Sequence, residues 1–209
     1  METHAELRIV DRRDVAFSPD GDPSAPPLAN ASKAVPLLWL GLFDYADVQV
    51  KRAESREVLA AVAPVSAARD RARRLLEQLP AEPRVLAGAA ATLARELERA
   101  PDGFVVLYPV EILAGMRPAE GRAYVGQLVN LSDVWERLRT GAAWDEVSSQ
   151  LHRVVPDISS VLEQQEPQIA RYFLIGSLAE ARESLDDVLV GVGQQDSDVE
   201  PQALAVGEQ

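Results

Sequence analysis

The sequence predicts an α+β protein with a small N-terminal β layer, packed helices and a mainly helical C-terminal half. Three observations carry this prediction. Segments with strand character lie before residue 110, apolar residues recur at helical spacing after it, and one strongly apolar run occupies Val35–Phe43. That run has six large apolar side chains within seven residues and no charge, so we expect it to be buried at the centre of the core.

The first elements are short. Two strand-like runs, Leu7–Val10 and Val15–Phe17, predict an edge strand or a hairpin. Ser18–Ser32 is rich in proline and polar residues, which predicts a flexible loop over residues 18–32. For the apolar run we expect a short buried helix, because Pro36 suits a first helical turn, although Gly41 weakens a helix.

The middle of the chain alternates between strand and helix patterns. Val48–Lys51 and Val58–Val65 flank a charged turn and predict a hairpin. Ser66 can cap a helix that runs to Leu79, and a second helix is expected from Arg84 to Arg99. Phe104–Tyr108 is the strongest strand signal, with the continuous apolar character of a strand buried on both faces.

After residue 110 the pattern is helical. Apolar residues recur at spacings of three and four over Tyr124–Leu138 and again over Trp144–Val154, and a further segment opens at Pro167 and ends at Gly176. Ser160 and Ser177 each precede a glutamate by three residues, which is the spacing of a capping box. The second box predicts a helix with an apolar inner side and an acidic outer side.

Charge is distributed unevenly along the chain. The formal net charge is −12, and residues 157–209 hold 11 acidic and 2 basic residues, whereas residues 1–156 hold 22 acidic and 19 basic residues. A field of this sign repels nucleic acid and anionic lipid and attracts cationic partners. We expect a single domain over residues 1–190, followed by a disordered acidic tail over residues 191–209.

The composition also indicates the cellular compartment. The chain has no cysteine, and its N-terminus has no apolar segment of the secretory type. Arginine greatly outnumbers lysine and alanine is abundant, which is typical of a GC-rich bacterial genome. We therefore expect a bacterial cytoplasmic protein.

Three carboxylates are candidates for chemistry. Asp44 and Asp47 directly follow the apolar run, where desolvation could tune an acid or base, or where the pair could contribute to a cation site. A solvated turn is the alternative, since no third ligand is visible. Glu111 lies in apolar surroundings after the strongest strand, and there an ion pair with Arg117 or Arg122 is the favoured alternative to a catalytic acid.

Other classes of site have little support. His152 fits a surface histidine, and the chain lacks both a nucleophile elbow and a phosphate-binding glycine motif. Arg69, Arg71, Arg73 and Arg74 fit a solvated helix face whose charges are largely satisfied within the helix. We assign no catalytic residue, no metal ligand and no cofactor.

The favoured function is a non-catalytic protein-binding protein, such as an adaptor, an assembly component or an immunity-type inhibitor. It would bind a partner with a cationic surface through an acidic C-terminal face, formed by Glu180, Glu183, Asp186 and Asp187. One alternative is a carboxylate-based or metal-assisted enzyme that uses Asp44, Asp47 and Glu111. A further alternative is a homo-oligomeric structural protein with Trp39 or Trp135 in a subunit interface.

Overall fold

The structure is a computed structural model. It describes residues 4–13, 27–32, 34–53, 56–81, 83–109, 113, 116–155, 158–162 and 167–178. Over these ranges the chain forms one antiparallel sheet and a set of helices, and the C-terminal half is mostly helical. The predicted α+β class is therefore confirmed.

Six strands form the sheet, in the order β3-β4-β5-β1-β2-β6, and each neighbouring pair is antiparallel. Five of the six come from the first 108 residues, and the sixth returns from the far end of the described chain. The strands are β1 (His4–Val10), β2 (Pro27–Ser32), β3 (Val48–Ala53), β4 (Arg56–Pro64), β5 (Phe104–Tyr108) and β6 (Ser177–Leu178).

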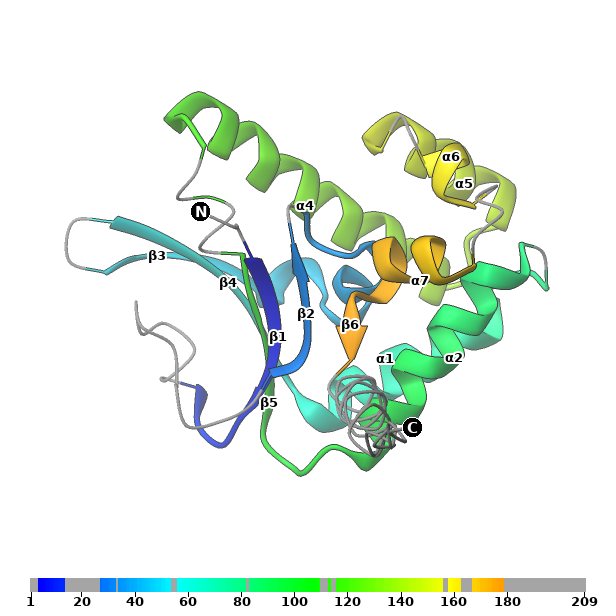
Figure 1. The fold of residues 1–209 in the computed structure, drawn as a ribbon, viewed down its shortest axis with the longest axis horizontal. Helices are drawn as coiled ribbons and strands as arrows, with labels where there is room; N and C mark the ends of the chain where they lie inside the picture. Colours follow the sequence, from blue (N-terminus) through cyan, green and yellow to red (C-terminus); the bar gives the residue numbers. More distant parts are fainter. Residues whose placement is uncertain are drawn as a thin grey trace, which may run out of the picture.

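The helices lie on one side of this sheet (Figure 1). Helices α1 and α2 pack against each other, α4 contacts α1 and α5, and α7 contacts α2 and α6. Their bounds are α1 (Val65–Gln78), α2 (Arg84–Arg99), α4 (Pro118–Arg139), α5 (Trp144–Val154), α6 (Ile158–Leu162) and α7 (Pro167–Ile175), with the short 3₁₀ helices η2 (Leu37–Leu42) and η3 (Tyr45–Asp47).

The apolar run occupies the centre of this assembly. All six residues of η2 are buried, and η2 contacts α1, α4 and α7. Trp39 is 0% exposed, and its indole Nε1–H donates to the carbonyl oxygen of Ile175 at 2.8 Å. The predicted buried helix is confirmed, but its hydrogen bonds join residues three apart, from Trp39 N to Pro36 O and from Phe43 N to Leu40 O. A 3₁₀ helix suits so short a run, because 3₁₀ segments are short and Gly41 disfavours a longer α-helix.

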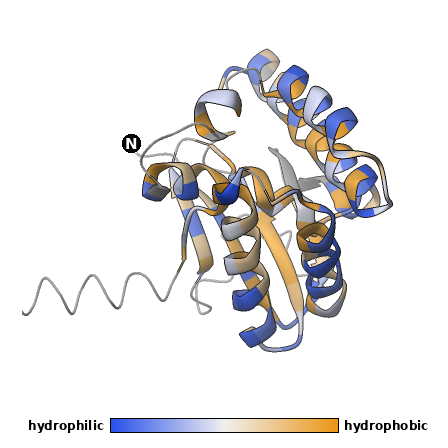
Figure 2. Ribbon diagram, turned by 90° about the vertical axis from the view of Figure 1, so that its right-hand side faces the viewer, coloured by the Kyte–Doolittle hydropathy of each residue, from blue (hydrophilic) through white to orange (hydrophobic). Residues whose placement is uncertain are grey.

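The two faces of the sheet carry different apolar clusters. Leu7 and Leu107 face the helices and belong to the main core, whereas Val62 and Val106 belong to a separate buried cluster formed by alternate residues of the same strands. Alternation of this kind follows from the two-residue period of a strand. Figure 2 shows hydrophobic residues concentrated on the strands and on the helix sides that face them, with hydrophilic residues along the outer helix surfaces.

Most of the local predictions are confirmed. The hairpin appears as β3 and β4, and the predicted strand at Phe104–Tyr108 appears as β5. The predicted helices appear as α1, α2, α4, α5 and α7. Helix α1 begins at Val65, so Ser66 lies inside its first turn and does not cap it.

Two predictions about the N-terminal region are wrong. Leu7–Val10 is a strand as predicted and lies in β1, but its predicted edge position is wrong, since β1 pairs with β5 on one side and β2 on the other. Pro27–Ser32, assigned to a flexible loop, forms β2, in which Ala29 and Ala31 are 1% and 2% exposed. Their small side chains fit beneath the core, and the pairing partners on both sides supply the order that the local sequence does not predict. Residues 14–26, which include Val15–Phe17, lie outside the described ranges.

The two predicted capping boxes are also wrong as helix starts. Ser160 lies inside α6, which begins at Ile158, and Ser177 lies in β6. Gly176 ends α7 with a φ of +70°, a conformation that glycine adopts readily, and Ser177 and Leu178 then pair with Asn30 and Ala29 of β2. Residues 179–209 lie outside the described ranges, so the acidic face and the tail remain predictions. Within the described part of the chain, no helix has the length and apolar character needed to cross a membrane.

Candidate functional site

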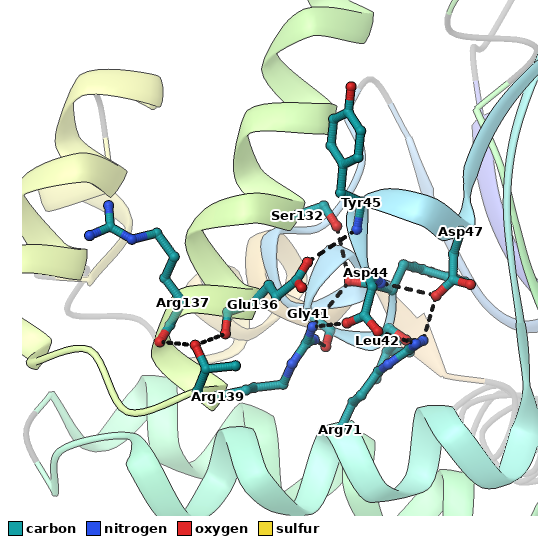
Figure 3. Close-up of polar contacts among 12 residues, drawn as sticks. Gly41, Leu42, Asp44, Tyr45, Asp47, Arg71, Ser132, Glu136, Arg137 and Arg139 are labelled. Carbon is teal, nitrogen blue, oxygen red and sulfur yellow. Dashed lines mark hydrogen bonds and ion pairs between the residues drawn. The ribbon is translucent and has the colours of Figure 1, made fainter.

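The site that the sequence singled out lies where η2 gives way to η3. Asp44 precedes η3 and Asp47 ends it, and the Asp47 carboxylate accepts a hydrogen bond from the Asp44 backbone N–H at 3.0 Å. The three-residue spacing thus brings the two carboxylates together, as predicted. Figure 3 shows them facing two arginines that approach from α1 and α4.

Arg71 of α1 holds both aspartates. Its Nη2 contacts Asp44 Oδ2, and its Nη1 lies 2.6 Å from Asp47 Oδ2. Nη1 also donates to the carbonyl oxygen of Leu42 at 3.0 Å. The side chain is 17% exposed, so these charge-assisted bonds are partly shielded from water and join α1 to the end of the apolar run.

Arg139, near the end of α4, completes the network. Its Nη2 contacts Asp44 Oδ1, and its Nη1 donates to the carbonyl oxygen of Gly41. The side chain is only 3% exposed. Burial lowers the pKa of the Arg139 guanidinium from its ordinary value, and the negative charge of Asp44 opposes that shift. Asp44 is therefore the main counter-ion of a buried cation.

The same groups satisfy the backbone at the end of η2. The carbonyl oxygens of Gly41 and Leu42 accept from the two arginines, and the Phe43 carbonyl accepts from the Ser132 hydroxyl at 2.9 Å. Terminal helix carbonyls have no partner inside the helix, and in a buried position they need one. We call Asp44, Asp47, Arg71 and Arg139 the ionic clamp, because they fix η2 and η3 between α1 and α4.

The chemistry of the clamp is that of a structural network. Asp44 uses both carboxylate oxygens, one for each arginine, and Asp47 uses Oδ2 for Arg71 and for the Asp44 backbone. A general base needs an oxygen free to take a proton, and a metal site needs lone pairs free of cations. Asp44 has no such oxygen, and Asp47 keeps only Oδ1 outside these contacts, so the solvated-turn alternative is corrected to a salt-bridged turn.

The third carboxylate of the enzyme hypothesis, Glu111, lies outside the described ranges, as does the side chain of Arg122. Arg117, the other partner considered for Glu111, pairs with Glu120 at the start of α4, and this hydrogen bonding lowers the pKa of Glu120. Among the residues that the structure describes, no three His, Asp or Glu side chains are grouped so that they could hold a metal ion.

The structure describes some of the remaining candidate residues and not others. His152 is exposed, as expected, and its Nε2 lies 3.0 Å from the Ser159 hydroxyl. Trp39 and Trp135 are both 0% exposed within the single chain, so neither is available to a subunit interface. The partner-binding candidates Glu180, Glu183, Asp186 and Asp187 lie beyond Leu178, outside the described ranges.

Sequence reasoning missed the role of the arginines. Arg69 and Arg71 belong to the predicted solvated face of α1, but Arg69 donates to the carbonyl oxygens of Leu97 and Ala100, and Arg71 enters the clamp. Of the four arginines of this face, only Arg73 forms an ion pair within α1, as predicted for the group. It contacts Asp70 at 3.2 Å and also contacts Glu98 of α2. The available signal was that Arg71 lies three residues after Ala68 and four before Leu75, so a helix places it beside two residues of the buried side.

No protein-family model, curated protein or solved structure is significantly similar to this chain.

Proposed function

We propose that this chain is a non-catalytic protein-binding protein of the bacterial cytoplasm, of the adaptor, assembly-component or immunity-inhibitor type. It recognises a partner with a cationic surface through the acidic C-terminal face formed by Glu180, Glu183, Asp186 and Asp187. The observation that carries this proposal is the charge distribution: residues 157–209 hold 11 acidic and 2 basic residues. Such a field raises the rate of encounter with a cationic protein.

The ionic clamp favours this proposal over the enzyme alternative. Asp44 and Asp47 were the two carboxylates best placed for catalysis, and both are engaged by Arg71 or Arg139. Breaking those contacts during a reaction would leave the guanidinium of Arg139 buried without its counter-ion, which is strongly unfavourable. The clamp does not neutralise the excess of negative charge in the C-terminal quarter, which is the largest charge imbalance along the chain.

The test begins with capture and ends with kinetics. Full-length protein is first used to capture partners from the source cell, and the captured protein is purified. The rate at which the two proteins associate is then measured at about 0.1 M and about 1 M salt. Over this range the Debye length falls from about 10 Å to about 3 Å. We expect Glu183→Lys/Asp186→Lys to slow association and to flatten its salt dependence, since rim charges act mainly on the association rate.

The matched control is Glu77→Lys/Asp133→Lys. It makes the same change in net charge at two exposed positions on α1 and α4, far along the chain from the acidic face. We expect its association rate to stay close to that of the parent protein. Equal slowing in the two double variants would show that overall charge alone is responsible, and an unchanged rate in Glu183→Lys/Asp186→Lys would end the proposal.

A further inference from the structure

One serine of the sheet lies against a histidine. Ser32 of β2 is directly opposite His4 of β1 in the antiparallel register, and the Ser32 Oγ is 3.3 Å from the His4 Nδ1. Their strand neighbours Ala31 and Ala5 belong to the main core and are 2% and 0% exposed. Because side chains alternate along a strand, Ser32 and His4 lie on the opposite face of the sheet, away from the helices in Figure 1, and both are partly exposed.

A tyrosine hydroxyl lies beside the same serine. Strand β6 pairs with β2 at Ala29 and Asn30. Further along β2, the Ser32 backbone N–H donates to the hydroxyl of Tyr172 in α7 at 2.6 Å. This hydroxyl keeps its own proton, and the described part of the chain shows no acceptor for it. Tyr172 can therefore donate a hydrogen bond to a negatively charged oxygen that forms next to Ser32.

The Ser32 hydroxyl and the His4 imidazole are related as a nucleophile and its base. A serine hydroxyl is a weak nucleophile until a neighbouring base takes its proton. In the tautomer that carries its proton on Nε2, His4 presents the lone pair of Nδ1 to this hydroxyl. The separation of 3.3 Å is slightly longer than a short hydrogen bond, which is common in such pairs before a substrate is bound.

The second histidine of the chain gives a comparison. The Nε2 of His152 in α5 lies 3.0 Å from the Oγ of Ser159 in α6, but His152 is exposed. Among the described residues, this serine has no counterpart of the Tyr172 hydroxyl. Ser159 is therefore a matched control, because it has the contact with a histidine and lacks the second hydroxyl.

We propose that Ser32 is a modification site that accepts one acyl group from a thioester or an activated ester. The Ser32 Oγ attacks the acyl carbon while its proton moves to His4 Nδ1, and Tyr172 donates to the carbonyl oxygen as that oxygen gains negative charge. The bond from the acyl carbon to the leaving sulfur or oxygen then breaks, and the imidazolium gives the proton to the leaving group. The products are an ester at Ser32 and a free thiol or alcohol. This inference goes beyond the proposed function and does not depend on it.

The probe is p-nitrophenyl acetate, an activated ester. Full-length protein is incubated with it and digested, and tandem mass spectrometry assigns each acetyl group to a residue. Hydroxylamine then distinguishes Ser32 from the adjacent Lys33, because it removes an acetyl ester and leaves an acetyl amide. We expect Ser32 to be acetylated about tenfold faster than Ser159, as for a hydroxyl assisted by a positioned base. In protein unfolded in urea, the two serines should react at the same rate.

Two variants test the neighbouring groups. His4→Gln keeps a hydrogen-bonding group opposite Ser32 but cannot take up its proton, and we expect acetylation of Ser32 to slow by about tenfold or more. Tyr172→Phe removes the hydroxyl alone and should slow the reaction by about tenfold. His152→Gln is the matched control and should leave the rate at Ser32 unchanged. Circular dichroism checks that each variant is folded.

A second measurement uses Ser32→Cys, because the chain has no cysteine of its own. The thiolate is the reactive form of a thiol, so a base beside it raises the rate of alkylation by iodoacetamide. Adding His4→Gln to this variant should slow alkylation by about tenfold. Equal acetylation of Ser32 and Ser159 in the folded protein, or an unchanged rate on His4→Gln in either measurement, would overturn the inference.

Discussion

Asp44 and Arg139 are 95 residues apart in the sequence, and their side chains form an ion pair in which the guanidinium is almost fully buried. The pair joins the turn after the apolar run to the end of α4. The same carboxylate also contacts Arg71, so one aspartate connects two helices. Stability should therefore depend strongly on this pair and little on the exposed ion pairs of the same helix.

We expect Arg139→Met to lower the free energy of unfolding by about 3–5 kcal/mol, because the change leaves Asp44 without one partner and the Gly41 carbonyl oxygen without its donor. The control is Arg137→Met, which removes an exposed pair with Glu146 and should cost about 1 kcal/mol or less. Urea unfolding of both variants makes the comparison. Similar losses in the two variants would contradict the role of the clamp.

Replacement of the central tryptophan should be equally severe. Trp39→Ala removes one of the two fully buried tryptophan side chains and its hydrogen bond to Ile175, and we expect a loss of about 3–5 kcal/mol. Trp144→Ala serves as the control, since Trp144 is only partly buried at the start of α5 and should cost less. Thermal and urea unfolding of both proteins test the ranking, and a larger effect at Trp144 would show that the apolar run is not the organising core.

Two glycines should respond to alanine in opposite directions. At Gly176, where φ is +70°, an added Cβ would lie 2.5 Å from the Asn30 carbonyl oxygen, and we expect Gly176→Ala to destabilise the fold by about 1–3 kcal/mol. At Gly126, inside α4, an added Cβ meets nothing within 4 Å, and Gly126→Ala should stabilise by about 0.5–1 kcal/mol. Differential scanning calorimetry should give melting temperatures on opposite sides of the parent value.

Tyr124 gives a prediction for alkaline pH. Burial raises the pKa of its hydroxyl above the ordinary value, although the hydrogen bond from the Val35 backbone N–H acts in the opposite direction. A raised pKa in the folded state means that its contribution to stability is complete below the unfolded pKa of about 10 and is lost as pH rises through the folded pKa.

The parent protein should therefore lose stability above about pH 10 more steeply than Tyr124→Phe, measured by urea unfolding at stepped pH. At neutral pH the same variant should be weaker by about 0.5–1.5 kcal/mol, because the Val35 N–H loses its acceptor. Tyr45→Phe, at a side chain that is 63% exposed, should follow the parent curve throughout. Parallel curves for all three proteins would refute the prediction.

The sequence predicted those elements whose signals are local. The continuous apolar strand Phe104–Tyr108 and the helix from Arg84 to Arg99 appear with the predicted bounds, because strand and helix periods are readable within a few residues. Strand β2 could not be predicted in this way. Its sequence has little strand propensity, and its conformation is fixed by pairing with β1 and β6.

The long-range partners in the candidate site could not be predicted from the sequence either. The proximity of Asp44 and Asp47 followed from their spacing, but nothing near Arg71 or Arg139 in the sequence indicates that these arginines meet Asp44 from 27 and 95 residues away. Ser177 was misassigned for a related reason. Its spacing to Glu180 is that of a capping box, but the turn at Gly176 directs it to the edge of the sheet beside β2.

The indole of Trp39 donates to a carbonyl 136 residues later in the chain, and this separation has a consequence during biosynthesis. At a translation rate of about 5–20 residues per second, Ile175 is added about 7–27 s after Trp39. Throughout that interval the most apolar segment of the nascent chain lacks a complete α7, and until Arg139 has been added it also lacks a complete α4; both helices later enclose it. The protein therefore most needs protection from aggregation while only its N-terminal half has been synthesised. Chaperones that bind apolar segments should act on the nascent chain during this period.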